Sequence, residues 1–174
     1  PDYIEARLLL ANALARSGRY NEAISFFSTI GPEQDNYFEV QHYMADLLDE
    51  AEQTDKALAL LNDLFMKHND VEALIRIGDI YRSKENYGSA LKAYNRAAGQ
   101  IGKSIPEEYW YLLYARGMVY EREGEWNKAE ADLKAALVYR PDHPYLLNYL
   151  GYAWADQGVH LDESLGLLER ASCL

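Results

Sequence analysis

The chain has 174 residues, and its hydrophobic content of 49% excludes a disordered chain and predicts a folded domain with a real core. Its 28 acidic residues against 17 Lys and Arg give a formal net charge of −11, which disfavours nucleic acid and anionic membrane surfaces as partners. We therefore expect neutral or basic protein partners.

Five segments, taken in chain order, share one pattern. A polar or Gly-containing turn leads into a small residue, which is followed by a second helical pattern. The small residues recur at steps of 34, 33, 39 and 35 residues, and they are Ala23, Ala57, Ala90, Ala129 and Ser164. A period near 34 residues is typical of repeats built from two antiparallel helices. The sequence therefore predicts about ten helices and no strands.

The pattern resembles the tetratricopeptide repeat (TPR), and residues 110–143 match it best. The matching residues are Gly117, Tyr120, Gly124, Trp126, Ala129, Leu133, Ala136 and Pro141. The resemblance implies an all-α, right-handed superhelical solenoid of about five helical hairpins, in one domain over residues 1–174 of a longer chain. Its repeats are expected at about residues 4–37, 38–70, 71–109, 110–143 and 144–174. The first two are degenerate, because Ala11 and Ala45 replace the close-packing glycine.

Small and bulky residues within each repeat predict how its two helices pack. Gly117 and Gly151 would let the helices approach closely, and bulky residues would fill the rest of the core. The bulky residues expected in the core are Tyr81, Tyr120 and Trp154.

The longest step, between the third and fourth repeats, holds about five extra residues within 98–108. This segment contains two Gly and one Pro, so we expect a longer loop between repeats. Two interpretations stay open, namely an insertion on a functional face and a tolerated surface insertion.

Catalytic and metal-binding patterns are missing from the sequence. The histidines share no ligand spacing with one another or with Cys173, and they are His42, His68, His143 and His160. The segment 68–70 is expected to end a helix, because His complements the helix dipole and Asn and Asp favour the turn. No stretch is long enough to span a bilayer. We expect no enzyme activity, no metal, no cofactor and no membrane insertion by this fragment.

The TPR resemblance implies a concave groove, lined by the first helix of each repeat, in which a protein or peptide binds. The positions that match the family's groove positions are Glu39, His42, Asp46, Asp49, Glu50, Asp79, Arg82, Tyr111, Tyr114, Met118, Arg122, Tyr145, Asn148 and Tyr152. Acidic residues dominate the earlier repeats, which favours a basic partner segment, and tyrosines dominate the later ones. The alternatives are a solvated acidic face and tyrosines that only cover hairpin edges. Leu8 stands where the family's clamp for chaperone carboxylates has a lysine, which disfavours that ligand.

Residues 141–158 and 161–165 also resemble a stretch of proteobacterial envelope TPR proteins, including outer-membrane lipoproteins that act as protease adaptors. This resemblance favours the bacterial periplasm or envelope over the cytoplasm. Our main hypothesis is a non-catalytic scaffold or adaptor. The alternatives are a substrate-recognition arm of a larger enzyme, with its catalytic domain outside this fragment, and a purely structural spacer. We also expect that an uncapped terminal repeat could support self-association.

Overall fold

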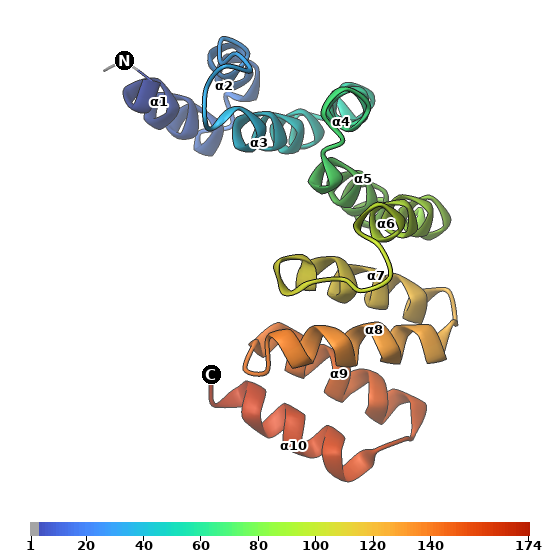
Figure 1. The fold of residues 1–174 in the computed structure, drawn as a ribbon. Coiled ribbons are helices and arrows are strands. Elements are labelled where there is room, and N and C mark those ends of the chain that lie inside the picture. Colours follow the sequence, from blue (N-terminus) through green and yellow to red (C-terminus); the bar gives the residue numbers. More distant parts are fainter. Residues whose placement is uncertain (1–3) are drawn as a thin grey trace. The chain divides into compact units, whose positions relative to one another are not determined.

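The computed structural model describes residues 4–174, apart from the side chains of residues 4, 5, 7 and 8, so the side chain of Leu8 lies outside the description. The described part contains ten α-helices and one short 3-10 helix, η1, and no strand (Figure 1). Their bounds are α1 (Ile4–Arg16), α2 (Tyr20–Phe27), α3 (Tyr37–Glu50), α4 (Thr54–His68), α5 (Val71–Ser83), α6 (Tyr87–Ile101), η1 (Glu107–Tyr109), α7 (Trp110–Arg122), α8 (Trp126–Tyr139), α9 (Pro144–Gln157) and α10 (Leu161–Ser172). The predicted all-α fold is confirmed.

The helices fall into two compact units, of which the first ends at Ile80 and the second begins at Tyr81. Within the first unit α1 packs on α2 and α3 on α4, and within the second α7 packs on α8 and α9 on α10. These four pairs of consecutive helices therefore form hairpins, as the repeat pattern predicts. The single domain over the whole chain stays a prediction.

The first helix of every hairpin ends in the same hydrogen-bonded turn. In each turn a backbone N–H donates to the carbonyl five residues earlier, at 2.8–3.0 Å, from Arg19, Gln53, Asn86, Glu125 and Val159. The residue before each donor has a positive φ, which Gly adopts at no steric cost. Glu52 (φ 59°) and Glu85 (φ 57°) hold this conformation in two of the turns, at a cost of about 1 kcal/mol each.

Two glycines allow close approach of paired helices in the second unit. A Cβ atom on Gly117 would lie 2.9 Å from Cγ of Leu133, and one on Gly151 would lie 2.8 Å from Cγ of Leu168. Real Cβ atoms essentially never come this close, so a larger residue would push the helices apart or displace the leucine. These contacts agree with the packing role predicted for both glycines.

Bulky residues expected in the core behave differently from one another. Trp154 is buried, and its indole nitrogen donates to Oε1 of Glu130 at 2.8 Å. Tyr81 and Tyr120 are only partly buried, which contradicts the core prediction for both. The contacts of Tyr120 are polar. Its hydroxyl donates to Oδ1 of Asn95, and the charged groups of Arg116 and Lys128 lie 5.7 and 5.5 Å from its ring centroid.

The longer loop predicted between the third and fourth repeats is present, and it is tied to α8. The hydroxyl of Tyr139 donates to the carbonyl oxygen of Ile105 at 2.8 Å, and the Ile105 side chain packs against the hydrophobic core of this unit. Arg140 forms an ion pair with Glu107. These contacts hold the loop against α8.

None of the helices in the described part of the chain combines the length and the apolar character needed to cross a membrane.

The end of α4 follows the prediction for residues 68–70. The helix stops at His68, and Asn69 takes the left-handed conformation with a φ of 53° while its N–H bonds the carbonyl of Phe65.

Candidate partner-binding surfaces

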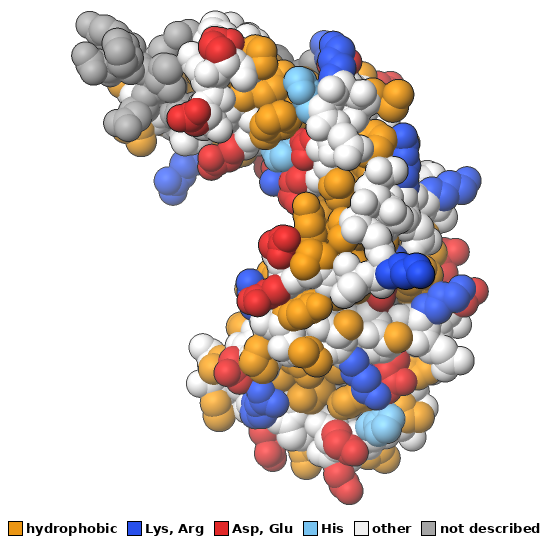
Figure 2. Space-filling view, in the orientation of Figure 1, with side chains coloured by type: hydrophobic (Ala, Val, Ile, Leu, Met, Phe, Trp, Pro, Cys, Tyr) orange, Lys and Arg blue, Asp and Glu red, His pale blue; other side chains and the backbone are white. Residues whose placement is uncertain are grey.

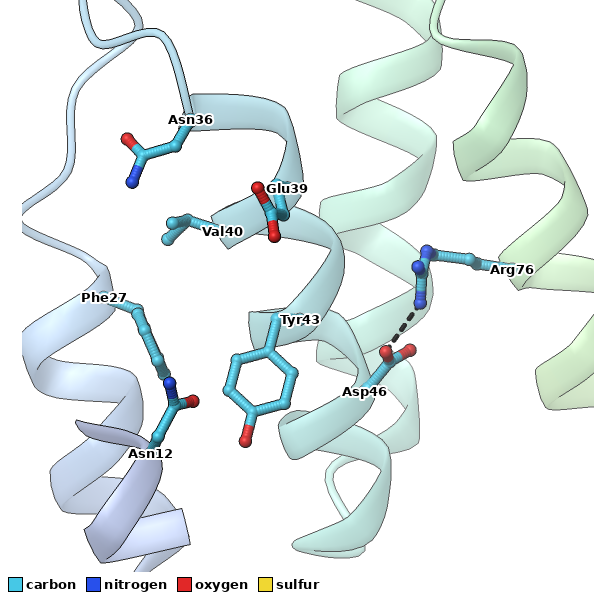
Figure 3. A pocket seen from close by; sticks show the side chains of 8 residues that line it. All are labelled: Asn12, Phe27, Asn36, Glu39, Val40, Tyr43, Asp46 and Arg76. Carbon is cyan, nitrogen blue, oxygen red and sulfur yellow. Dashed lines mark hydrogen bonds and ion pairs between the residues drawn. The ribbon is translucent and has the colours of Figure 1, made fainter. Parts of the chain in front are cut away.

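The first unit contains a pocket of about 360 Å³ beside α3. Its lining residues come from α1, α2, α3 and α5 and from the residue before α3, and they are Asn12, Phe27, Asn36, Glu39, Val40, Tyr43, Asp46 and Arg76 (Figure 3). We call it the acidic pocket, because Glu39 and Asp46 contribute two carboxylates to it. Hydrophobic side chains gather over α3 in Figure 2, with acidic side chains near them.

Asp46 and its neighbour Glu72 share one cation. Nη1 of Arg76 donates to Oδ2 of Asp46 at 2.6 Å, and Nε of Arg76 lies 3.6 Å from Oε1 of Glu72. Burial raises the pKa of both carboxyl groups above their ordinary values, although the positive charge of Arg76 opposes that rise. The nearby Asp79 raises both pKa values further. Several of the acidic residues predicted for the groove region therefore lie close to a single arginine, Arg76.

The remaining acidic-half residues differ in how far a partner could reach them. His42 is only 7% exposed, and its Nε2 lies 2.5 Å from Oδ2 of Asp70. Asp49 accepts a hydrogen bond from the Thr54 hydroxyl at 2.6 Å, which joins α3 to the start of α4. Glu39 and Glu50 are exposed, so they are the most accessible acidic residues of the predicted groove.

The second unit carries a continuous cluster of rings on α7, on α9 and at the residue before α9, which we call the aromatic surface. Its members are Trp110, Tyr111, Tyr114, His143, Tyr145 and Tyr149, with neighbouring ring centroids 4.7–6.5 Å apart. These separations are those of interacting aromatic pairs. Tyr114 lies at the centre, in contact with four of the other rings. The sequence predicted three of the six residues for the groove.

A smaller pocket of about 220 Å³ adjoins the aromatic surface through Tyr149. Met118, Arg82 and Arg122 of the predicted groove all line it. Arg82 donates to the hydroxyl of Tyr111 at 3.2 Å, and the hydroxyl of Tyr149 donates to Oε2 of Glu121 at 3.0 Å. Burial and the charge of Glu121 raise the pKa of the Tyr149 hydroxyl, so it remains a neutral donor.

The last hairpin presents the other predicted groove residues. Tyr145 and Tyr152 are 72% and 63% exposed, and with Asn148 they line a pocket of about 330 Å³ that also includes Leu168 of α10. Two further leucines of α10, Leu161 and Leu165, are exposed as well. Self-association through this hairpin stays a prediction.

Sequence reasoning missed several residues of both surfaces. Tyr43 and Arg76 line the acidic pocket, and Trp110, His143 and Tyr149 join the aromatic surface. Only Trp110 and Tyr149 carried a signal, since each is an aromatic residue next to, or one turn along from, a predicted groove tyrosine. The described residues include no group of three or more His, Cys, Asp or Glu arranged to hold a metal ion.

Comparison with known families agrees with the geometry of the hairpins. Three family profiles, each described as Tetratricopeptide repeat, match residues 1–47, 44–105 and 110–143. This chain belongs to the tetratricopeptide repeat family. The predicted TPR solenoid is thereby confirmed.

Similar proteins show the same repeat architecture at low sequence identity. A TPR repeat-containing protein of Pseudomonas aeruginosa is 27% identical over 149 residues, which are 86% of this chain and 25% of that protein. A crystal structure of MamA superimposes with a TM-score of 0.69 at 18% identity, over 92% of this chain and 91% of that one. MamA from Desulfovibrio magneticus RS-1 gives a TM-score of 0.70 at 16% identity, over 99% of this chain and 94% of that one. At such identities the structural likeness establishes the fold alone.

Proposed function

We propose that this TPR chain is a non-catalytic scaffold or adaptor segment that binds a protein or peptide on the first helices of its hairpins. The observation that carries the proposal is the aromatic surface on α7 and α9. A hairpin core does not require exposed rings, yet Tyr145 keeps 72% of its surface exposed while its ring centroid lies 6.0 Å from that of His143.

The aromatic surface is suited to supply most of the affinity. Tyrosines bury a large area at a small cost in side-chain entropy and are enriched among the residues that dominate binding energies. The inner rings support the outer ones, because Tyr114 packs against Tyr149 with centroids 6.1 Å apart. A partner would therefore meet a surface that is already ordered, which lowers the entropic cost of binding.

The acidic pocket and its surroundings favour a partner segment with positive charge. Glu39 and Glu50 are exposed, and Asp46 and Glu72 share the single guanidinium of Arg76. Together with the net charge of −11, this excess of carboxylates would attract a basic segment and repel an acidic one.

The chain spans about a quarter of the length of the curated relative that it matches. For the full protein we propose only that these repeats are the part that recognises the partner. An envelope location and a role as the recognition arm of an enzyme are further proposals of the same kind.

Partner capture tests the proposed function. The intact protein and a variant with Tyr145→Ala, Tyr152→Ala, Glu39→Gln and Glu50→Gln would each be used to retain proteins from a lysate of the source organism. We expect at least one protein to be retained by the wild type and lost with the variant, at equal helicity by circular dichroism. Equal retention by both proteins would contradict the proposal.

A further inference from the structure

The acidic pocket contains several polar side chains that have no partner among the described residues. Asn12 and Asn36 form no side-chain hydrogen bond with any described residue, although Asn36 stands at the N-terminus of α3, where it could cap the helix. Glu39 forms no ion pair with a described residue either. Among the described residues, Asp46 accepts one side-chain hydrogen bond, at Oδ2, and none of them donates to Oδ1. The pocket thus offers several hydrogen-bond acceptors that the fold itself does not use.

The remaining wall of the pocket is apolar and rigid. Phe27 and Val40 are almost fully buried, and the ring of Tyr43 meets the ring of Phe27 edge to face, with centroids 5.2 Å apart. Figure 3 shows Phe27 and Tyr43 on one side of the pocket and the Asp46–Arg76 pair on the opposite side. A ligand that fits this lining needs an apolar stem and a polar, positively charged end.

We propose that the acidic pocket binds one arginine side chain of the partner. The proposal rests on the proposed function and names the anchor that the basic partner segment would supply. The methylene stem would lie against Phe27, Val40 and Tyr43, and the guanidinium would reach the carboxylates of Glu39 and Asp46.

Arginine fits this lining better than lysine for two reasons. A guanidinium carries five N–H donors in a planar fork, which suits acceptors distributed around the pocket, whereas an ammonium group has three donors and is more strongly hydrated. A guanidinium also stacks on aromatic rings, and the partly exposed ring of Tyr43, which packs on the buried Phe27, provides one. Asp46 already binds the guanidinium of Arg76 through Oδ2, so the incoming arginine would use Oδ1.

Nuclear magnetic resonance on the intact protein tests this assignment with small probes. The ¹⁵N-labelled protein would be titrated with Nα-acetyl-arginine methylamide, and separately with the matching citrulline and lysine compounds. Citrulline has nearly the shape of arginine but no charge. We expect saturable shifts at Asn36, Val40 and Tyr43, with half-saturation by the arginine compound at a concentration at least about 5-fold lower than for the other two.

Three variants separate a specific site from general attraction. Glu39→Gln and Asp46→Asn should each weaken the arginine compound about 3-fold or more, whereas Asp55→Asn, an exposed acid at the start of α4, should have no effect. Glu39 is exposed and unpaired, so its variant stays informative even if Asp46→Asn destabilises the fold. Shifts absent from the pocket, an equal response to the lysine compound, or insensitivity to Glu39→Gln would each overturn the proposal.

The arginine site and the proposed function can fail separately. If the arginine compound fails while a captured partner still requires Tyr145 and Tyr152, the arginine site is wrong and the binding module stands. If partner capture is unaffected by every surface variant, the proposed function falls even if the pocket binds arginine.

Discussion

Nε2 of His42 on α3 lies 2.5 Å from Oδ2 of Asp70, the residue just before α5, and the two side chains are only 9% and 12% exposed. The pair joins residues 28 positions apart in the sequence. A buried polar group that loses its partner keeps its desolvation cost, so this contact fixes the end of α4 and the start of α5 against α3.

We predict that His42→Ala and Asp70→Ala each lower the free energy of unfolding by about 1–3 kcal/mol, because each leaves one buried group without a partner. The double variant should cost less than the sum of the two, with a coupling of about 1 kcal/mol. Urea denaturation of the four proteins measures both quantities. Asp35→Ala, an exposed acid in the loop before α3, serves as the control, and additive effects of the two substitutions would contradict a direct contact.

Gly151 and Gly166 provide a matched pair of helical glycines. A Cβ on Gly151 would meet Leu168 at 2.8 Å, whereas a Cβ on Gly166 would meet nothing within 4 Å. We therefore predict that Gly151→Leu destabilises the protein by about 1–3 kcal/mol or more, and that Gly166→Ala stabilises it by up to about 1 kcal/mol. Thermal unfolding of both variants checks the signs. An unchanged melting temperature for Gly151→Leu would refute the close packing of α9 on α10.

The guanidinium of Arg116 binds both carboxylate oxygens of Asp132, at 2.6 and 2.9 Å, and the two side chains are 14% and 12% exposed. Asp132→Asn would leave the arginine charge nearly buried, and we predict a loss of about 2–4 kcal/mol. The exposed pair of Arg170 and Asp142 has a similar distance of 2.9 Å, yet Asp142→Asn should cost only about 0–1 kcal/mol. Similar losses for the two variants, measured by denaturant unfolding, would contradict the role given to burial.

The raised pKa of Glu72 should make its contribution to stability decrease as the pH rises. Burial raises the pKa of its carboxyl in the folded state, so the folded protein holds this proton more tightly than the unfolded chain. The contribution of the Glu72 carboxyl to the free energy of unfolding is fully present below about pH 4. It is lost as the pH rises through the raised pKa of the folded state. Glu72→Gln should therefore gain stability relative to the wild type between pH 4 and 7, in melting curves recorded across that range.

Glu22→Gln serves as a control of opposite sign. A hydrogen bond from Arg19 lowers the pKa of Glu22, so its contribution is present at neutral pH and is lost as the pH falls. Glu22→Gln should therefore become less stable than the wild type as the pH rises. The difference should be small because the Arg19–Glu22 pair is exposed. If the stability difference between Glu72→Gln and the wild type did not change with pH, or changed in the same direction as for Glu22→Gln, the raised pKa of Glu72 would be contradicted.

The sequence was sufficient for the repeat architecture, because the features that define a hairpin are local. Gly117 and Gly151 mark close helix contacts, and the turn after each first helix follows from a left-handed residue such as Gly124. The surfaces were harder to predict. The repeat register tells which side of a helix a residue is on, but not which side chain of another helix meets it.

Three residues illustrate that limit. His42 occupies a groove position but is buried, because Asp70, from the turn after α4, reaches it. Tyr120 occupies a core position but is only partly buried, and Asn95, Arg116 and Lys128 contact its hydroxyl and ring. Tyr114 was predicted as a groove contact, yet its four ring neighbours make it a support for the surface as well. For this reason Tyr145 and Tyr152 are better probes of binding.

Isothermal titration calorimetry of a captured partner at low and high salt tests whether the two surfaces bind it. We predict that Tyr145→Ala with Tyr152→Ala weakens binding at both salt concentrations, by about 30-fold or more if one tyrosine contributes about 2 kcal/mol. Glu39→Gln with Glu50→Gln should mainly reduce the salt dependence, because it removes long-range attraction to a basic segment. If the partner bound both double variants as tightly as the wild type and with the same salt dependence, neither surface would be the binding site and the account would be wrong.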